Sequence, residues 1–187
     1  MNRFITSLIA TLAFTVCGLT WVLAQSSAST ARTASPSTLA PLEFLVGGVW
    51  HGELPARPDG SKMGIDLRSD WSPNHQSIRF DSAFISGGKP SPYTSGAYSW
   101  NPVGKQIVFA YTDAEGSLIE GAVSVENAAL VHNFTISKAN AEIEKARAII
   151  TPHGRNSYTN DIFVDKGGSF QKIASLQYDR VGAAEAR

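Results

Sequence analysis

The chain has 187 residues, with 16 basic and 16 acidic side chains, so its formal charge is zero and nothing in that balance attracts nucleic acid or an anionic membrane. It contains a single cysteine, which excludes an internal disulfide framework. This length, with no second linker past the N-terminal region, predicts one domain with a single buried core.

Residues 1–24 join Arg3 to a long apolar run that ends in the small residue Ala24, which predicts a secretory signal peptide cleaved after Ala24. Two other interpretations stay open. The run is about long enough to be an uncleaved membrane anchor, and Cys17 would be the anchor of a lipoprotein. Cleavage would give a secreted or periplasmic protein without stable membrane insertion.

Residues 25–40 contain almost no large apolar side chain, so they cannot offset their ordering entropy by burial, and they are predicted to be a flexible linker. The domain itself is predicted over residues 41–181, followed by a disordered tail at 182–187. At its start, the run PLEFLV begins with Pro41 and is followed by two glycines, which predicts a short helix.

From Trp50 onward, ten short runs are separated by segments rich in Gly, Pro, Asn and Asp, which favour tight turns. Within several runs, apolar and polar residues alternate with the period of a strand. Turns this short exclude crossover helices, so the pattern predicts an all-β fold, a roughly ten-stranded antiparallel up-and-down β-barrel with a short N-terminal helix. Residues 139–150 have a helix-favouring composition, but a helix there would interrupt the meander, so we assign them to a strand.

Gly48 and Trp50 lie at the head of the first predicted strand, and Arg180 lies at the end of the last one. This arrangement resembles the Gly-x-Trp signature of the calycin superfamily, which includes lipocalins and fatty-acid-binding proteins, where the tryptophan closes one end of the barrel beneath an arginine. The resemblance implies that these three residues close the barrel here. The contact between guanidinium and indole would contribute about 0.5 to 2 kcal/mol.

Longer stretches, FLVGGVWHGE and YSWNPVGKQIVFAYTDAEG, resemble bacterial lipocalin-like exported domains of unassigned function, which are distantly similar to the haem-binding nitrobindins. That similarity implies haem held by a histidine near the C-terminus. The last histidine of this chain is His153, two predicted strands too early. We therefore predict no haem binding.

His132 lies in the run LVHNFTI, where Leu130, Phe134 and Ile136 share its face in a regular strand. A histidine among apolar neighbours can bind a ligand, exchange protons or ligate a metal, and the alternative is a core histidine that a hydroxyl satisfies. Arg79 and Asp81 also share one face. That face is either the lumen, where an arginine would hold a carboxylate as in fatty-acid-binding proteins, or a solvated outer surface.

Neighbouring strands are rich in aromatic residues, which either line a pocket or fill the core. The sequence therefore predicts a small hydrophobic or amphipathic ligand in the lumen. The candidate ligand-binding residues are His132, Phe134, Arg79, Tyr98, Phe109 and Tyr111. Two other functions stay open: a small isomerase or hydrolase that uses His132 with Asp81 or Glu120, and a structural domain whose lumen is filled.

The sequence contains no nucleophile elbow, metalloprotease helix, phosphate loop or cysteine nucleophile in the predicted domain. We therefore name no catalytic residue and expect no metal or cofactor. The four histidines lie in four separate runs, so their spacing indicates no metal site. The oligomeric state has no signal in the sequence.

Overall fold

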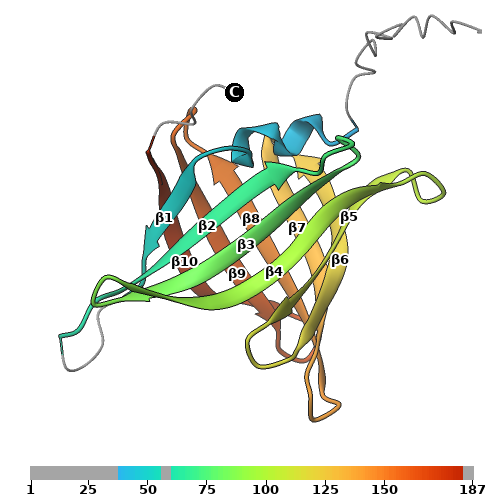
Figure 1. The fold of residues 1–187 in the computed structure, drawn as a ribbon. Helices are drawn as coiled ribbons and strands as arrows, with labels where there is room; N and C mark the ends of the chain where they lie inside the picture. The colour runs from blue at the N-terminus through green and yellow to red at the C-terminus, as the bar shows by residue number, and fades with distance from the viewer. Residues whose placement is uncertain (1–37, 56–59, 183–187) are drawn as a thin grey trace, which may run out of the picture. The chain divides into compact units, whose positions relative to one another are not determined.

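The structure, a computed structural model, describes residues 38–55 and 60–182, which form a closed β-barrel (Figure 1). One short 3-10 helix, η1 (Ala40–Leu45), precedes ten strands. They are β1 (Val49–Glu53), β2 (Met63–Trp71), β3 (Ser77–Ser86), β4 (Lys89–Asn101), β5 (Gln106–Asp113), β6 (Leu118–Glu126), β7 (Ala129–Ser137), β8 (Ile143–Pro152), β9 (Ser157–Asp165) and β10 (Phe170–Val181). The predicted fold class is confirmed.

Each strand pairs antiparallel with the next along the chain, and β1 pairs with β10, so the sheet closes and has no free edge. In the closing pair, Trp50 lies opposite Arg180, and across β2 it lies opposite Leu67. Helix η1, drawn in blue, lies across one end of the barrel (Figure 1). We call this the closed end, and the opposite end, which carries the β3–β4, β5–β6 and β7–β8 turns, the mouth.

Two-residue turns fix the register of two hairpins. Asn127 and Ala128 join β6 to β7 with φ angles of 50° and 63°, and Gly87 and Gly88 join β3 to β4 with φ angles of 56° and 74°. A turn with positive φ at both central residues has a twist that matches the twist of the strands it connects. The pairing of Glu126 with Ala129 follows directly from this geometry.

The helix-favouring segment 139–150 is a turn followed by most of β8, so the prediction of a strand is confirmed from Ile143 onward. The backbone N–H of Lys138 donates to the carbonyl oxygen of Glu142 and closes the turn before the strand begins. Pairing with β7 and β9 on both sides satisfies the backbone of β8, and this outweighs the weak helical preference of its alanines and lysine.

The packed core begins earlier in the chain than we predicted. Leu39, which falls in the predicted linker 25–40, is only 2% exposed and joins a cluster with Leu42 and Leu45. A single leucine at the end of a polar segment is enough to bring that end into the core, because burying one such side chain contributes about 1.5 to 3 kcal/mol. The other residues of the predicted linker, and the predicted signal peptide 1–24, lie outside the described residues except for Thr38 and Ala40.

Candidate functional site

The closed end of the barrel is sealed by Trp50, whose side chain is completely buried. Its indole Nε1–H donates to the carbonyl oxygen of Leu45 at 3.0 Å, and the guanidinium carbon of Arg180 lies 4.2 Å from the centre of its ring. The guanidinium also donates to three backbone carbonyl oxygens, those of Phe44, Val46 and Gly47. The indole N–H of Trp50 and both terminal nitrogens of Arg180 therefore help to close the barrel.

Gly48 is required at this end by its backbone and by its neighbours. Its φ is +73°, in the left-handed region, and a Cβ atom on it would lie 3.3 Å from the carbonyl oxygen of Gly182 and 3.4 Å from Cγ of Arg180. A larger residue would therefore be strained and would press on the Arg180 side chain. The glycine leaves room for the contact between Arg180 and Trp50.

The strand register places His132 on the inner face of the barrel. It lies opposite Val123 on β6 and Ala148 on β8, and Ala148 lies in turn opposite Ile162 on β9. The side chain of His132 is 4% exposed. The histidine therefore points into the barrel, at a level above the sealed floor.

The polar contact of His132 inside the barrel is with Tyr98. Their Nε2 and hydroxyl atoms are 3.2 Å apart; Nδ1 makes no hydrogen bond of normal geometry, and the ring interacts only weakly with the Leu130 carbonyl. Burial lowers the pKa of His132 to about 4, against a smaller opposing effect of the Leu130 carbonyl, because the charged ring would lose its hydration. The imidazole is therefore neutral at neutral pH, and it can accept or donate a hydrogen bond but carries no charge.

Aromatic rings on β3, β4, β5 and β7 surround this pair and form what we call the aromatic wall: Phe80, Tyr98, Phe109, Tyr111 and Phe134. The ring centre of Phe109 lies 5.3 Å from the ring centre of His132, 5.7 Å from that of Tyr98 and 5.9 Å from that of Phe134. Edge-to-face and tilted contacts of this kind hold the rings in fixed positions. The wall is therefore a rigid apolar surface.

Toward the mouth, inner positions of β8, β9 and β10 carry smaller side chains, which form what we call the small-residue wall: Ala146, Ala148, Ile162 and Ala174. Ala146 is buried, but Ala148, Ile162 and Ala174 are half-buried although they point inward. A side chain on the inner face of a closed barrel reaches solvent only if the lumen is not filled at that level. The lumen is therefore accessible along this wall.

Three polar atoms on the inner face are buried without a hydrogen-bond partner: Oγ of Ser69, Nδ1 of His132 and Oδ1 of Asn160. They come from β2, β7 and β9, so they lie around the barrel and not in one cluster. Buried polar atoms in native proteins nearly always have partners, and an exception marks a place where another group is expected. Ser69 and Asn160 had no signal in the sequence beyond strand alternation.

The structure brings five of the six predicted ligand-binding residues together. Tyr98, Phe109, Tyr111, His132 and Phe134 all contribute to the aromatic wall or contact it. Arg79 is not among them, because it is exposed on the outer face of β3. Ile78, Phe80 and Ser82 occupy the inner positions of that strand, so alternation turns Arg79 outward.

The two carboxylates considered as partners of His132 also face outward. Asp81 and Glu120 are exposed, at positions that alternate with the inner residues of β3 and β6. His132 therefore has no carboxylate partner within the described residues. The acid–base pair that we considered for an isomerase or hydrolase is not assembled by this fold.

The inner face does not fit haem. Inner positions of β9 and β10 are occupied by Tyr158, Asn160, Leu176 and Tyr178, none of which supplies an imidazole. The Nε2 atom of His132 is already engaged with the Tyr98 hydroxyl, at 3.2 Å, and is not free to serve as an axial ligand. Between residues 38–55 and 60–182 there is also no group of three metal-ligating side chains that could hold another metal ion.

The side chains of the other three histidines make their contacts outside the lumen. His51 contacts Asp66 with 2.6 Å between Nδ1 and Oδ1, and His153 contacts the Thr159 hydroxyl at 2.6 Å. His75 stacks on the ring of Trp71. In the part of the chain that the structure describes, no helix combines the length and the apolar character needed to cross a membrane.

No protein-family model matches this chain, and a search of characterised proteins found no match either. The fold is similar to the crystal structure of Rv2717c from M. tuberculosis, with a TM-score of 0.53 and 11% sequence identity. The similarity covers 79% of this chain and 99% of that chain. At this level of identity it shows a shared barrel fold and nothing about function.

Proposed function

We propose that the barrel binds a small apolar or amphipathic molecule in its lumen. The observation that carries this proposal is the partial exposure of Ala148, Ile162 and Ala174 on the inner face, above a floor sealed by Trp50. A concave, mostly apolar space with a closed base and a few polar atoms is the usual form of a small-molecule site. The aromatic wall and the small-residue wall give that space two unlike sides.

The polar atoms on the inner face would orient the bound molecule. The Asn160 side chain is half-buried with an unpartnered Oδ1, and the Tyr98–His132 pair lies within the aromatic wall. A ligand that satisfies such an atom removes the penalty of about 1 to 3 kcal/mol that an unpaired buried polar group carries. Apolar contact would therefore supply affinity, and the few polar atoms would supply orientation.

We infer in addition a relationship to calycins and an exported location. What supports the relationship is the contact between Trp50 and Arg180 at the closed end of an up-and-down barrel. What supports export is the sequence of residues 1–24, which lie outside the described residues. A secreted or periplasmic barrel would meet its ligand outside the cytoplasm.

The proposal is tested with an uncharged fluorescent probe, N-phenyl-1-naphthylamine, and a variant that fills the lumen. Ala148→Trp places a large ring on the inner face, and the matched control Ala110→Trp places the same ring at an exposed outer position of β5. We expect saturable probe binding by the parent and by Ala110→Trp, and loss of at least about tenfold in affinity for Ala148→Trp. Circular dichroism and melting curves check that both variants are folded.

Native mass spectrometry of the purified protein provides a second readout, because a carried-over small molecule would appear as a defined mass increase. A parent that binds no probe and carries no molecule would contradict the proposal and favour a structural domain. Equal probe binding by the two tryptophan variants would also contradict it, since the probe would then lie outside the lumen.

A further inference from the structure

The lumen contains no free cation. In the strands within residues 49–55 and 63–181, the inner-face side chains between the Trp50 level and the mouth are uncharged. At the mouth itself, Asp113 and Glu144 lie on the inner face. Arg180 is the exception at the closed end, and its guanidinium lies under Trp50, bound to backbone carbonyl oxygens. Lys89 lies opposite Ser86 beside the β3–β4 turn, so it shares the inner face only at the outermost rim of the mouth, where it is exposed.

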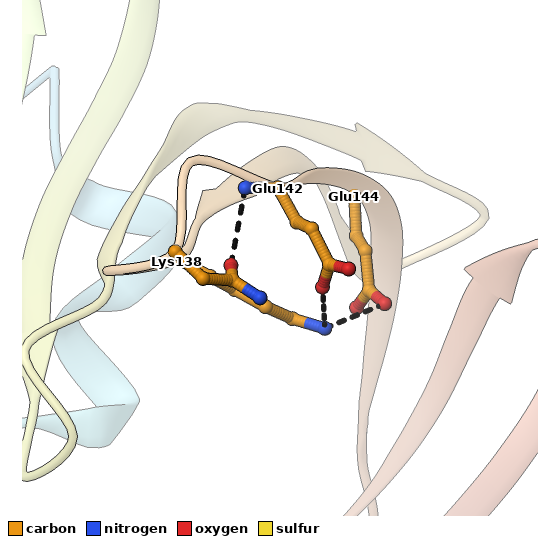
Figure 2. A network of polar contacts seen from close by, with 4 residues as sticks. Lys138, Glu142 and Glu144 are labelled. Carbon is orange, nitrogen blue, oxygen red and sulfur yellow. Dashed lines mark hydrogen bonds and ion pairs between the residues drawn. The ribbon is translucent and has the colours of Figure 1, made fainter.

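At the mouth, the ammonium group of Lys138 is already held by two carboxylates. Figure 2 shows its Nζ atom between the side chains of Glu142 and Glu144, at 3.5 Å and 2.8 Å from their oxygens. The hydrogen bond with Glu144 raises the pKa of Lys138, so this lysine stays charged but engaged. It is therefore not available to neutralise an anion that enters the barrel.

The hydrogen-bonding capacity of the lumen comes instead from neutral hydroxyl groups. Tyr98, Tyr111, Tyr158 and Tyr178 occupy inner positions of β4, β5, β9 and β10. Burial raises the pKa of each, that of Tyr178 to about 12, so all four remain protonated at neutral pH. Among these four, Tyr98 is the one whose hydroxyl makes a hydrogen bond to another described residue.

We propose that the lumen selects an uncharged aromatic molecule that carries a hydroxyl or carbonyl group, and rejects a carboxylate of the same shape. This inference rests on the proposed function, because it names the class of ligand for that same site. A carboxylate in this space would lose its hydration without gaining a cation, which is a large penalty, whereas a hydroxyl or carbonyl would exchange hydrogen bonds with tyrosine hydroxyls and the Asn160 amide.

In fatty-acid-binding proteins an arginine in the lumen holds the carboxylate of the ligand. Arg79 cannot do so here, because it lies on the outer face of β3. The aromatic wall favours a molecule with a ring of its own, since its ring edges and faces can make edge-to-face or offset contacts with an aromatic partner. The small-residue wall leaves room for the second face of such a molecule, where Ala148 and Ala174 are half-buried.

The experiment compares three probes with the same two-ring body: 2-naphthol, 2-naphthoate and trimethyl(2-naphthylmethyl)ammonium. Dissociation constants for the purified protein are measured by titration calorimetry at about pH 7, where the first is neutral, the second anionic and the third cationic. We expect 2-naphthol to bind at least about tenfold more tightly than either charged probe. Competition with N-phenyl-1-naphthylamine checks that each probe occupies the lumen.

A reversed preference provides the second test. Ile162→Arg places a guanidinium on the inner face, and the matched control Gln177→Arg adds the same charge at an exposed outer position of β10. We expect Ile162→Arg to shift the ratio of the two dissociation constants toward 2-naphthoate by about tenfold or more, and Gln177→Arg to leave it unchanged. If Ile162→Arg does not fold, the three probes on the parent still decide the inference.

The outcomes separate this inference from the proposed function. Binding of 2-naphthoate or of the ammonium probe in the lumen as tightly as 2-naphthol would overturn the inference and leave ligand binding in place. No binding of any probe would overturn both. An equal response of Ile162→Arg and Gln177→Arg would also overturn the inference, since the charge would then act from outside the lumen.

Discussion

The closed end and the lumen of this barrel treat polar side chains in opposite ways. At the closed end, the indole N–H of Trp50 and the guanidinium of Arg180 have hydrogen-bond partners on the backbone. In the lumen, His132 and Asn160 each keep a buried polar atom without a partner. The comparison teaches that the paired polar groups of Trp50 and Arg180 stabilise the fold, whereas the unpaired ones in the lumen cost stability and support the proposed ligand site.

The largest effect is expected at the closed end. Trp50→Ala removes a completely buried indole, together with its hydrogen bond and its contact with Arg180. We expect the free energy of unfolding to fall by about 3 to 5 kcal/mol, measured by urea denaturation. A protein near the usual limit of stability would then be largely unfolded at room temperature.

Trp71→Ala is the matched control, because this tryptophan is half-buried and stacks on His75 near the β2–β3 turn. Its loss is expected to cost clearly less than that of Trp50. Equal losses for the two variants would contradict the special role of the closed end and would indicate that any large ring contributes alike.

The second prediction sharpens the comparison through pH. The pKa of His132 is lowered to about 4 in the folded protein from its ordinary value of 6.5, so the unfolded chain binds the proton more readily. The stabilisation is fully present above about pH 6.5 and is lost as the pH falls toward 4, by up to about 3 kcal/mol.

Measurement of the free energy of unfolding of the parent and of His132→Leu across this pH range isolates that contribution. The difference between the two curves should shift in favour of the variant as the pH falls. A difference that does not change with pH would mean that the imidazole is not buried in neutral form.

The third prediction concerns a hydrogen bond inside the lumen. Tyr98→Phe removes the hydroxyl that contacts Nε2 of His132 and leaves the buried imidazole with only its weak interaction with the Leu130 carbonyl. We expect a loss of about 1 to 3 kcal/mol in the free energy of unfolding. Tyr158→Phe, which removes a hydroxyl with no hydrogen bond to a described residue, is expected to be nearly neutral.

Denaturation curves of the two variants, taken under the same conditions, decide this point. Tyr98→Phe and Tyr158→Phe should differ clearly in their urea midpoints. If both variants behave like the parent, the Tyr98–His132 contact does not contribute to stability.

The smallest change is expected when haem is added to the protein. Titration of the purified protein with haem should give no sharp Soret band, because the imidazole of His132 is buried behind Tyr98 and no inner position of β9 or β10 carries a histidine. A stoichiometric band that disappears in His132→Leu would contradict this prediction and would show that the lumen opens farther than its side chains indicate.

The sequence predicted the barrel because its signals are local. Turn residues such as Asn127 and Gly87 separate runs of alternating polarity, and both features act within a few residues of the chain. The relation between Gly48, Trp50 and Arg180 came from a family resemblance, since contacts across more than a hundred residues leave no local pattern.

The lumen was harder to predict, because alternation groups residues without saying which group is inside. Arg79 and Asp81 were considered as lumen residues together, and both lie outside, since Phe80 and Ser82 take the inner positions. Ser69 and Asn160 were missed because an unpartnered polar atom depends on its three-dimensional surroundings. Nothing in a strand pattern distinguishes it from a solvated side chain.

The contact of Arg180 with the segment after η1 has a consequence for the order of events in folding. The hydrogen bond from Arg180 to Val46 joins residues 134 positions apart, and β1 has β10 as its second neighbour. Strand β1 therefore cannot complete its pairing until β10 has been synthesised. Until then, β1 and β9 both present unpaired edges. Folding of this chain is expected to be slow and late, with its greatest tendency to aggregate just before the final strand arrives.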